Sequence, residues 1–163
     1  MKANKPILGD FIVSSEKQVL YFRASGTWNE WLMEKYRKQF YRYAKPLSLS
    51  PWCMFVEGTH WEMATPGFWE ELYKIIQWSE QHKLTHKAIV LCDNPFIALD
   101  ANTIKTYHQS VQVETFLSLS EAVEWLSRLG FDISLNRTLQ LLTQRNLMGT
   151  GSNENSYYCK TGS

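Results

Sequence analysis

The pattern of hydrophobic and polar positions changes from strand-like to helix-like within the first 45 residues. Residues 10–14 (DFIVS) and 18–25 (QVLYFRAS) are rich in β-branched and aromatic side chains and are separated by the turn-prone SEK, which predicts an antiparallel hairpin. Over residues 28–44, apolar side chains recur at spacings of four and three, as on one helix face. Thr27 is the expected N-cap of this helix, and Pro46 is expected to end it.

Three further apolar runs are each followed by a helical pattern. The expected strands are residues 51–56 (PWCMFV), 87–93 (KAIVLCD) and 111–116 (VQVETF). The expected helices cover residues 66–82, 97–108 and 118–130. This alternation predicts an α/β fold with a mostly parallel five-stranded sheet and about four helices, because strand, helix, strand units join parallel strands by right-handed crossovers. The N-terminal hairpin adds an antiparallel strand.

A C-terminal extension follows this unit, which spans residues 8–131 as a single domain. Residues 132–148 could form an amphipathic helix, and residues 149–163 read as a flexible polar tail rich in Gly, Ser and Asn. The helix would carry a leucine stripe formed by Leu135, Leu139 and Leu142. That stripe could cover its own sheet or dock on another subunit or partner, so a homo-oligomer stays open.

Composition and charge restrict the classes of partner. The chain has 163 residues, 44% of them hydrophobic, which is enough for one good core. A net charge of +1 provides no overall field to attract nucleic acid, so no nucleic-acid partner is expected, although residues 35–45 carry a basic stripe. Apolar runs such as residues 88–92 are too short to span a bilayer, so we expect no stable membrane insertion and a cytoplasmic location.

The sequence contains no established catalytic, cofactor or metal motif. Its four histidines do not form an H-E-x-x-H pattern, and its three cysteines are widely separated. Nucleophile-elbow, phosphate-loop and dinucleotide fingerprints are also missing from the sequence. We therefore expect a protein that is not an enzyme and has no cofactor or metal. One enzyme hypothesis stays open, in which His60 and Glu62 act together at a strand exit.

Residues 60–72 (HWEMATPGFWEEL) set two tryptophans around a helix start. Pro66 suits the first helical position and biases Thr65 toward extended dihedral angles, which are those of an N-cap. The hydroxyl of Thr65 is then expected to accept a hydrogen bond from the amide of Gly67 or Phe68. Because glycine weakens a helix, Gly67 suggests close packing against a neighbour or an approach surface.

Several strings, taken with the order of elements, resemble a known family. They are ASGTWN (24–29), PWCMFVEG (51–58), TPGFWEEL (65–72) and SLSEAVEWL (118–126). Over about residues 8–131 the chain resembles the STAS superfamily, within it the soluble bacterial SpoIIAA-like branch of anti-sigma-factor antagonists. The resemblance implies a regulatory α/β domain.

In phosphorylation-controlled members of that family, a D-S-x-G motif begins the helix after the third strand, and its serine is the regulatory site. The matching residues here are Ala64, Thr65, Pro66 and Gly67. The resemblance therefore makes Thr65 a candidate equivalent of the phosphorylated serine, although Ala64 replaces the aspartate of the motif. A phosphate there would lie among glutamates, which repel it. Cap and switch therefore both remain as interpretations of Thr65.

The leading hypothesis is a non-enzymatic STAS-like regulatory module that binds a protein partner. The expected partner-binding surface consists of His60, Trp61, Glu62, Gly67, Phe68 and Trp69, because exposed aromatic residues are enriched in interface cores. The alternative is a domain that binds a small molecule or lipid in an apolar pocket between helix and sheet.

Overall fold

The strands of the computed structural model, which describes residues 8–143, form one five-stranded sheet in the order β1-β2-β3-β4-β5. Their bounds are β1 Asp10–Glu16, β2 Val19–Trp28, β3 Trp52–Ala64, β4 Leu84–Val90 and β5 Gln112–Phe116. β1 pairs antiparallel with β2, and every other neighbouring pair is parallel. The predicted fold class is thereby confirmed.

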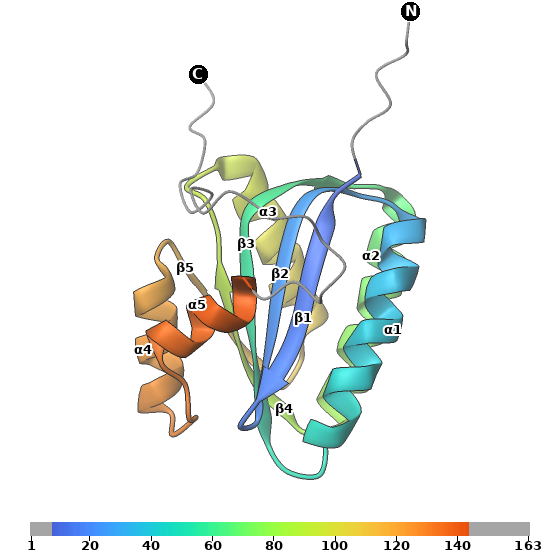
Figure 1. The fold of residues 1–163 in the computed structure, drawn as a ribbon. Coiled ribbons are helices and arrows are strands. Elements are labelled where there is room, and N and C mark those ends of the chain that lie inside the picture. Colours follow the sequence, from blue (N-terminus) through green and yellow to red (C-terminus); the bar gives the residue numbers. More distant parts are fainter. Residues whose placement is uncertain (1–7, 144–163) are drawn as a thin grey trace, which may run out of the picture.

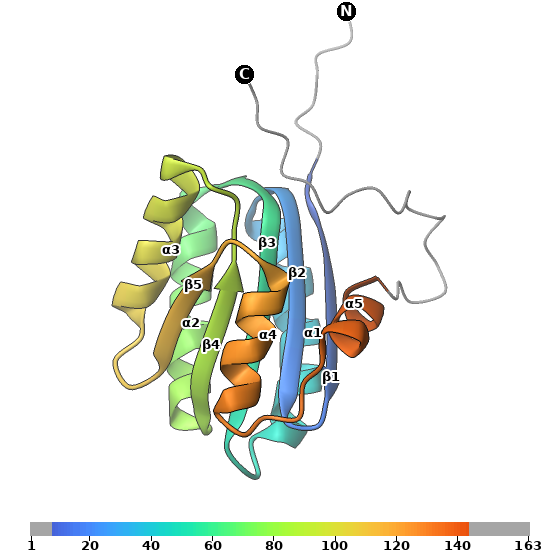
Figure 2. The same cartoon turned by 90° about the vertical axis from the view of Figure 1, so that its left-hand side faces the viewer.

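Helices cover both faces of this sheet (Figure 1). One face carries the three crossover helices, α1 (Glu30–Leu47), α2 (Pro66–Gln81) and α3 (Pro95–Tyr107), and the other carries α4 (Leu119–Arg128) and α5 (Leu135–Thr143), as Figure 2 shows from the side. Because α1, α2 and α3 directly follow the parallel strands β2, β3 and β4, their N-termini lie at the edge where these strands end. We call this the carboxyl edge.

The start and end of α1 differ from the prediction. Asn29, not Thr27, is its N-cap, and the Asn29 side chain accepts a hydrogen bond of 3.0 Å from the amide of Leu32. Trp28 instead remains the last residue of β2 and is fully buried. Pro46 lies inside the last turn of α1, where its missing N–H removes only one helical hydrogen bond near the end.

Strand β3 is longer than predicted, and this places residues 60–64 in the sheet instead of a loop. The strand continues to Ala64 because its second half pairs with the end of β2, as the register Ser25↔His60 and Trp28↔Ala64 shows. Register shifts in β2 accompany this pairing, and such bulges re-aim side chains where they occur. The stretch preceding Thr65 is therefore held by backbone hydrogen bonds.

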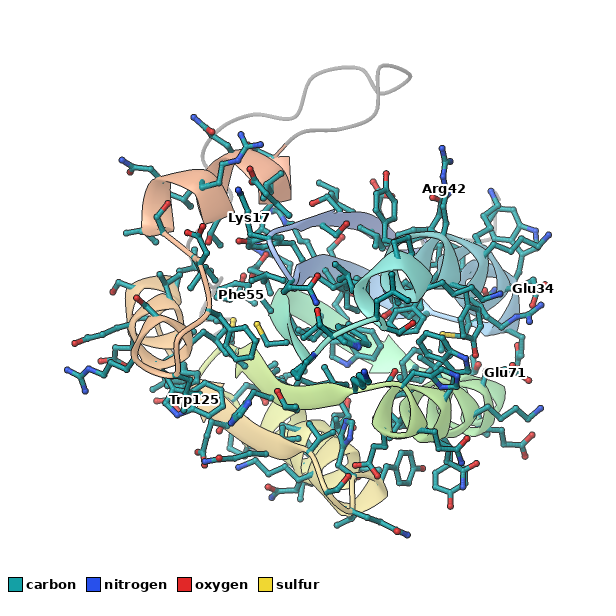
Figure 3. All side chains as sticks on the ribbon, turned by 90° about the horizontal axis from the view of Figure 1, so that it is seen from below. Lys17, Glu34, Arg42, Phe55, Glu71 and Trp125 are labelled. Carbon is teal, nitrogen blue, oxygen red and sulfur yellow. The ribbon has the colours of Figure 1, made fainter. Side chains whose placement is uncertain are left out.

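Two hydrophobic layers flank the sheet. The layer under α1 and α2 is dominated by aromatic side chains, including Trp28, Tyr36 and Phe40. The layer under α4 and α5 contains Phe55 among its fully buried residues, and Figure 3 shows Phe55 between the sheet and these two helices. Glu34, Arg42 and Glu71, also labelled there, lie on the outside of α1 and α2.

Helix α5 packs on its own sheet, which favours one of the two roles left open for the leucine stripe. Its buried residues are Thr138, Leu141 and Leu142, which belong to the layer over β1 and β2. Leu135 is exposed and Leu139 is half-buried, so the buried stripe is shifted from the predicted one. The predicted continuation to residue 148 and the predicted tail at 149–163 lie outside the described residues.

Replacing Leu142 tests whether α5 belongs to the cooperative unit. Leu142 is fully buried, so Leu142→Ala should lower the free energy of unfolding by about 2–5 kcal/mol in urea denaturation. Leu135→Ala, the same change at an exposed position of the same helix, should cost less than about 0.5 kcal/mol. Equal, small effects for both variants would mean that α5 does not contribute to the folded core.

Candidate functional site

The six residues predicted as a partner-binding surface come together near the carboxyl edge, but their aromatic side chains do not point outward. Phe68 is buried, with 6% of its surface exposed, so its assignment to a surface is wrong. Trp61 and Trp69 are half-buried, and each ring centroid lies 5.1 Å from that of Phe68. Within the predicted set only Glu62 is exposed. Apolar packing accounts for this, because three adjoining aromatic rings gain more by burial against the sheet than by exposure.

Thr65 begins α2 with the expected extended backbone, yet its side chain does not cap the helix. The amide of Phe68 donates to the main-chain oxygen of Thr65 (3.1 Å), while the Thr65 hydroxyl donates to Glu30 Oε1 (3.2 Å). The prediction of a side-chain cap is therefore wrong. The Thr65 hydroxyl binds a carboxylate of another helix instead of its own helix amides, and this hydrogen bond links the starts of α1 and α2.

Gly67 has the close packing that the sequence suggested. A side-chain carbon at this position would overlap the carboxylate and Cγ of Glu30. The Glu30 carboxylate thus lies against the first turn of α2, where the partial positive charge of a helix N-terminus favours an anion. An anion added at Thr65 would meet a carboxylate already in that position.

His60 and Glu62 each have another hydrogen-bond partner. The Nδ1 atom of His60 lies 3.1 Å from the hydroxyl of Thr59, and Glu62 accepts a hydrogen bond of 3.2 Å from Thr27. The structure thus gives no geometric support to the hypothesis that His60 and Glu62 act together as an enzyme, and that hypothesis stays a prediction. Among the described residues there is also no group of three or more His, Cys, Asp or Glu side chains that could hold a metal.

A cavity of about 70 Å³ lies between the sheet and the helices α1, α2 and α3. Its lining is predominantly aromatic and aliphatic and includes Phe22, Tyr36, Phe68, Trp69, Ile75 and Ile104. This is the location named by the alternative hypothesis, an apolar pocket between helix and sheet. Trp61, Phe68 and Trp69, which were predicted to bind a protein, all line it.

The cavity is elongated and has a polar group toward each end. Its lining includes Phe68 and Ser79 of α2, which a helical rise of 1.5 Å per residue separates by roughly 16 Å. Toward the carboxyl edge, the indole Nε1 of Trp61 donates to Asp100 Oδ2 (3.0 Å). Toward the opposite end lies Lys87, a lysine of β4 that is only 5% exposed.

Lys87 is the first member of a buried chain of polar side chains. Its Nζ atom lies 2.8 Å from His108 Nε2, and His108 Nδ1 lies 3.1 Å from Glu80 Oε1. The same carboxylate oxygen accepts hydrogen bonds from the backbone amides of residues 109, 110 and 111. A neutral His108 that donates from Nδ1 and accepts at Nε2 satisfies both neighbours.

Burial sets the protonation states of this chain. It lowers the pKa of Lys87 to about 7, against a smaller opposing effect of Glu80. It also lowers the pKa of His108 to about 3, assisted by the charge of Lys87. Burial alone would raise the pKa of Glu80, but the backbone amides and His108 outweigh it and hold this pKa below its usual value. Near neutral pH, Glu80 is therefore a carboxylate and His108 a neutral imidazole, and the Lys87 amine loses its proton readily.

No local sequence pattern indicates this set of polar side chains, because its members come from three parts of the fold. Glu80 and His108 are 28 residues apart, and His108 follows α3 while Glu80 lies near the end of α2. One signal is present in the sequence: Lys87 and Ile89 alternate on β4 and share the side that faces α2 and α3, so a sheet covered on that side buries both.

Comparison with known proteins supports the fold and leaves the activity open. No protein-family model matches the chain, and no curated protein sequence matches it. The crystal structure of an uncharacterised DUF3478-family protein from Shewanella loihica PV-4, which has a SpoIIAA-like fold, superposes with a TM-score of 0.60 at 13% identity. The match covers 77% of this chain and 98% of that one. The SpoIIAA-like fold expected from the resemblance is thus confirmed.

None of the described helices combines the length and apolar character required to cross a bilayer.

The lowered pKa of Lys87 predicts how stability depends on pH. As pH rises from about 7 toward the ordinary lysine value of 10.5, the unfolded chain still carries the proton on Lys87 while the folded chain has lost it. Since stability rises with pH wherever the unfolded state binds more protons, the wild type should gain stability in this window relative to Lys87→Met. Urea denaturation at several pH values measures this difference. A difference between the two proteins that stays constant with pH would contradict the pKa shift.

Proposed function

We propose that this protein is a non-enzymatic binding module that holds a small apolar ligand in the cavity between the sheet and helices α1, α2 and α3. The observation that carries the proposal is the orientation of Trp61, Phe68 and Trp69, which line the cavity instead of forming an exposed face. Ligand sites are typically apolar concavities with a few placed polar groups. Asp100 and Lys87 are such groups.

The cavity volume restricts the ligand class. One water molecule needs about 10–15 Å³ by this kind of measure, and an engineered cavity of about 150 Å³ binds benzene. A volume of about 70 Å³ therefore suits a molecule of a few heavy atoms. A lipid acyl chain would require the helices to separate from the sheet, so a small molecule is the better fit of the two ligand classes considered.

A second function, binding of a protein partner at the carboxyl edge, is favoured by two exposed apolar side chains. Trp31 at the start of α1 and Met63 near the end of β3 are 57% and 60% exposed. Trp31 directly follows Glu30 in the sequence, and Met63 lies two residues before Thr65. Nearby Glu62 and Glu70 are also exposed, so the partner would present a basic surface with an apolar centre.

Filling the cavity tests the first function. Ala101 of α3 is buried and lines the cavity, so Ala101→Leu should occupy the space and weaken binding of xenon and butan-1-ol by at least about tenfold. Chemical-shift changes in NMR titrations of these two probes measure the affinity. Ala98→Leu makes the same change at an exposed position of α3 and should leave binding unchanged. Binding that is absent from the wild type, or equal in both variants, would contradict the proposal.

Substitutions at Thr65 and Glu30 test the pair at the carboxyl edge. Thr65→Asp should place two carboxylates in contact, so Glu30→Gln should stabilise the Thr65→Asp protein more than the wild type, with a coupling on the order of 1 kcal/mol. A double-mutant cycle in urea measures this coupling. If the edge binds a partner, Thr65→Asp should also lose a captured protein that Leu49→Lys, at an exposed site of the opposite end, retains. Identical capture profiles would count against the second function.

A further inference from the structure

The buried amine at the end of the cavity has a chemical capacity that the proposed function does not use. Within residues 8–143, Lys87 Nζ has one hydrogen-bond partner, His108 Nε2, at 2.8 Å. A protonated lysine has three donors and no acceptor, so a charged Lys87 would be poorly compensated in its 5% exposed position. A neutral amine needs less compensation and retains a lone pair.

The groups around Lys87 favour the neutral amine. On the neighbouring strands its register partners are Met54 and Val113, both apolar. The titratable groups that face it are His108, at the end of α3, and beyond it Glu80 of α2. The Glu80 carboxylate accepts hydrogen bonds from three backbone amides and His108, and its charge opposes the effect of burial on Lys87 only in part.

A desolvated lysine in an apolar pocket is the usual form of a nucleophilic amine, because loss of its proton exposes the nitrogen lone pair near neutral pH. The neighbouring imidazole, oriented by the Glu80 carboxylate, accepts a hydrogen bond from the nitrogen at Nε2 and so fixes the position of the amine. The apolar walls of the cavity favour a carbon skeleton of a few atoms over a charged group. An electrophile that satisfies both features is a small aldehyde or ketone.

We propose that Lys87 captures a small apolar aldehyde or ketone in this cavity as a reversible imine, with His108 and Glu80 as positioning residues. The inference rests on the proposed function, since the carbonyl compound must occupy the same cavity. It specifies the ligand class and adds a covalent bond to it.

The step balances without an oxidant or a reductant. The lone pair of the Lys87 nitrogen forms a bond to the carbonyl carbon, and the carbonyl π pair moves to oxygen. One proton passes from nitrogen to that oxygen, while His108 Nε2 holds the nitrogen by the hydrogen bond described above. The resulting carbinolamine loses its hydroxyl group with the second proton of the original amine, which gives an imine and one water molecule. Hydrolysis reverses the reaction and releases the carbonyl compound.

Reductive trapping tests the proposal in the full-length protein. Butanal is added near pH 7 with sodium cyanoborohydride, which reduces any imine to a stable secondary amine, and peptide mass spectrometry then locates the butyl group. We expect Lys87 to be modified at least about tenfold faster than Lys74, whose side chain is 67% exposed. An excess of butan-1-ol, which fills the cavity but cannot form an imine, should protect Lys87 and leave Lys74 unaffected. The rate at Lys87 should rise as pH passes through about 7.

Variants separate the imine from simple binding. Lys87→Met should lose the modification that butan-1-ol suppresses in the wild type, and Ala98→Leu, at an exposed position of α3, should retain it. His108→Gln should keep the site of modification but slow the reaction and change its pH profile. Butan-1-ol binding to the wild type without faster modification of Lys87 would overturn the imine proposal and leave the proposed function standing. Failure of butan-1-ol to bind the wild type would overturn the proposed function. Modification of Lys87 that butan-1-ol does not slow would overturn the inference that the reaction occurs in the cavity.

Discussion

The burial of Trp28 at the end of β2 is the constraint on which this side of the molecule depends. The centroid of its ring lies 5.7–5.9 Å from the ring centroids of five aromatic residues, Phe11, Phe22, Tyr36, Trp61 and Phe68. These partners belong to β1, β2, α1, β3 and α2. One fully buried indole therefore fixes two strands and two helices relative to its own strand, and pairs of this type add to the free energy of burial. It also explains why β3 continues to Ala64, since Trp61 must reach this cluster from the sheet.

The cavity follows from the same packing. Rigid aromatic rings meet at fixed angles and leave space that a flexible aliphatic chain would fill. The aromatic cluster shares four residues with the cavity lining, Phe22, Tyr36, Trp61 and Phe68. The polar groups toward its ends are held by partners of their own, Asp100 by Trp61 and Lys87 by His108. They are thus kept in place without a ligand, as preorganised binding requires.

The periodicity of apolar residues was sufficient to predict the helices and strands of the fold. It was insufficient wherever contacts between residues far apart in the sequence determine the extent of a strand or the partner of a side chain. Residues 66–82 and 111–116 were assigned correctly to within about one residue because their apolar spacing matches one period only. The second half of β3 was missed because its pairing with β2 depends on residues about 35 positions away. The side-chain cap predicted for Thr65 was wrong for the same reason, since Glu30 binds its hydroxyl. The contact between Lys87 and His108 depends on how β4 and the end of α3 pack together, which no local sequence pattern indicates.

The two candidate functions share one structural element, the first turn of α2. Thr65 at its start is bonded to Glu30 of α1, and Phe68, three residues later, lines the cavity. Because α1 and α2 both form walls of the cavity, a change that separates Glu30 from Thr65 would act on the same helices that enclose a ligand. A phosphate or carboxylate at position 65 is such a change, since it repels Glu30. Occupancy of the cavity and the state of the carboxyl edge are therefore expected to be energetically coupled, and by linkage the coupling is equal in both directions. The regulatory role expected from the sequence and the proposed ligand-binding role are in this sense compatible with each other.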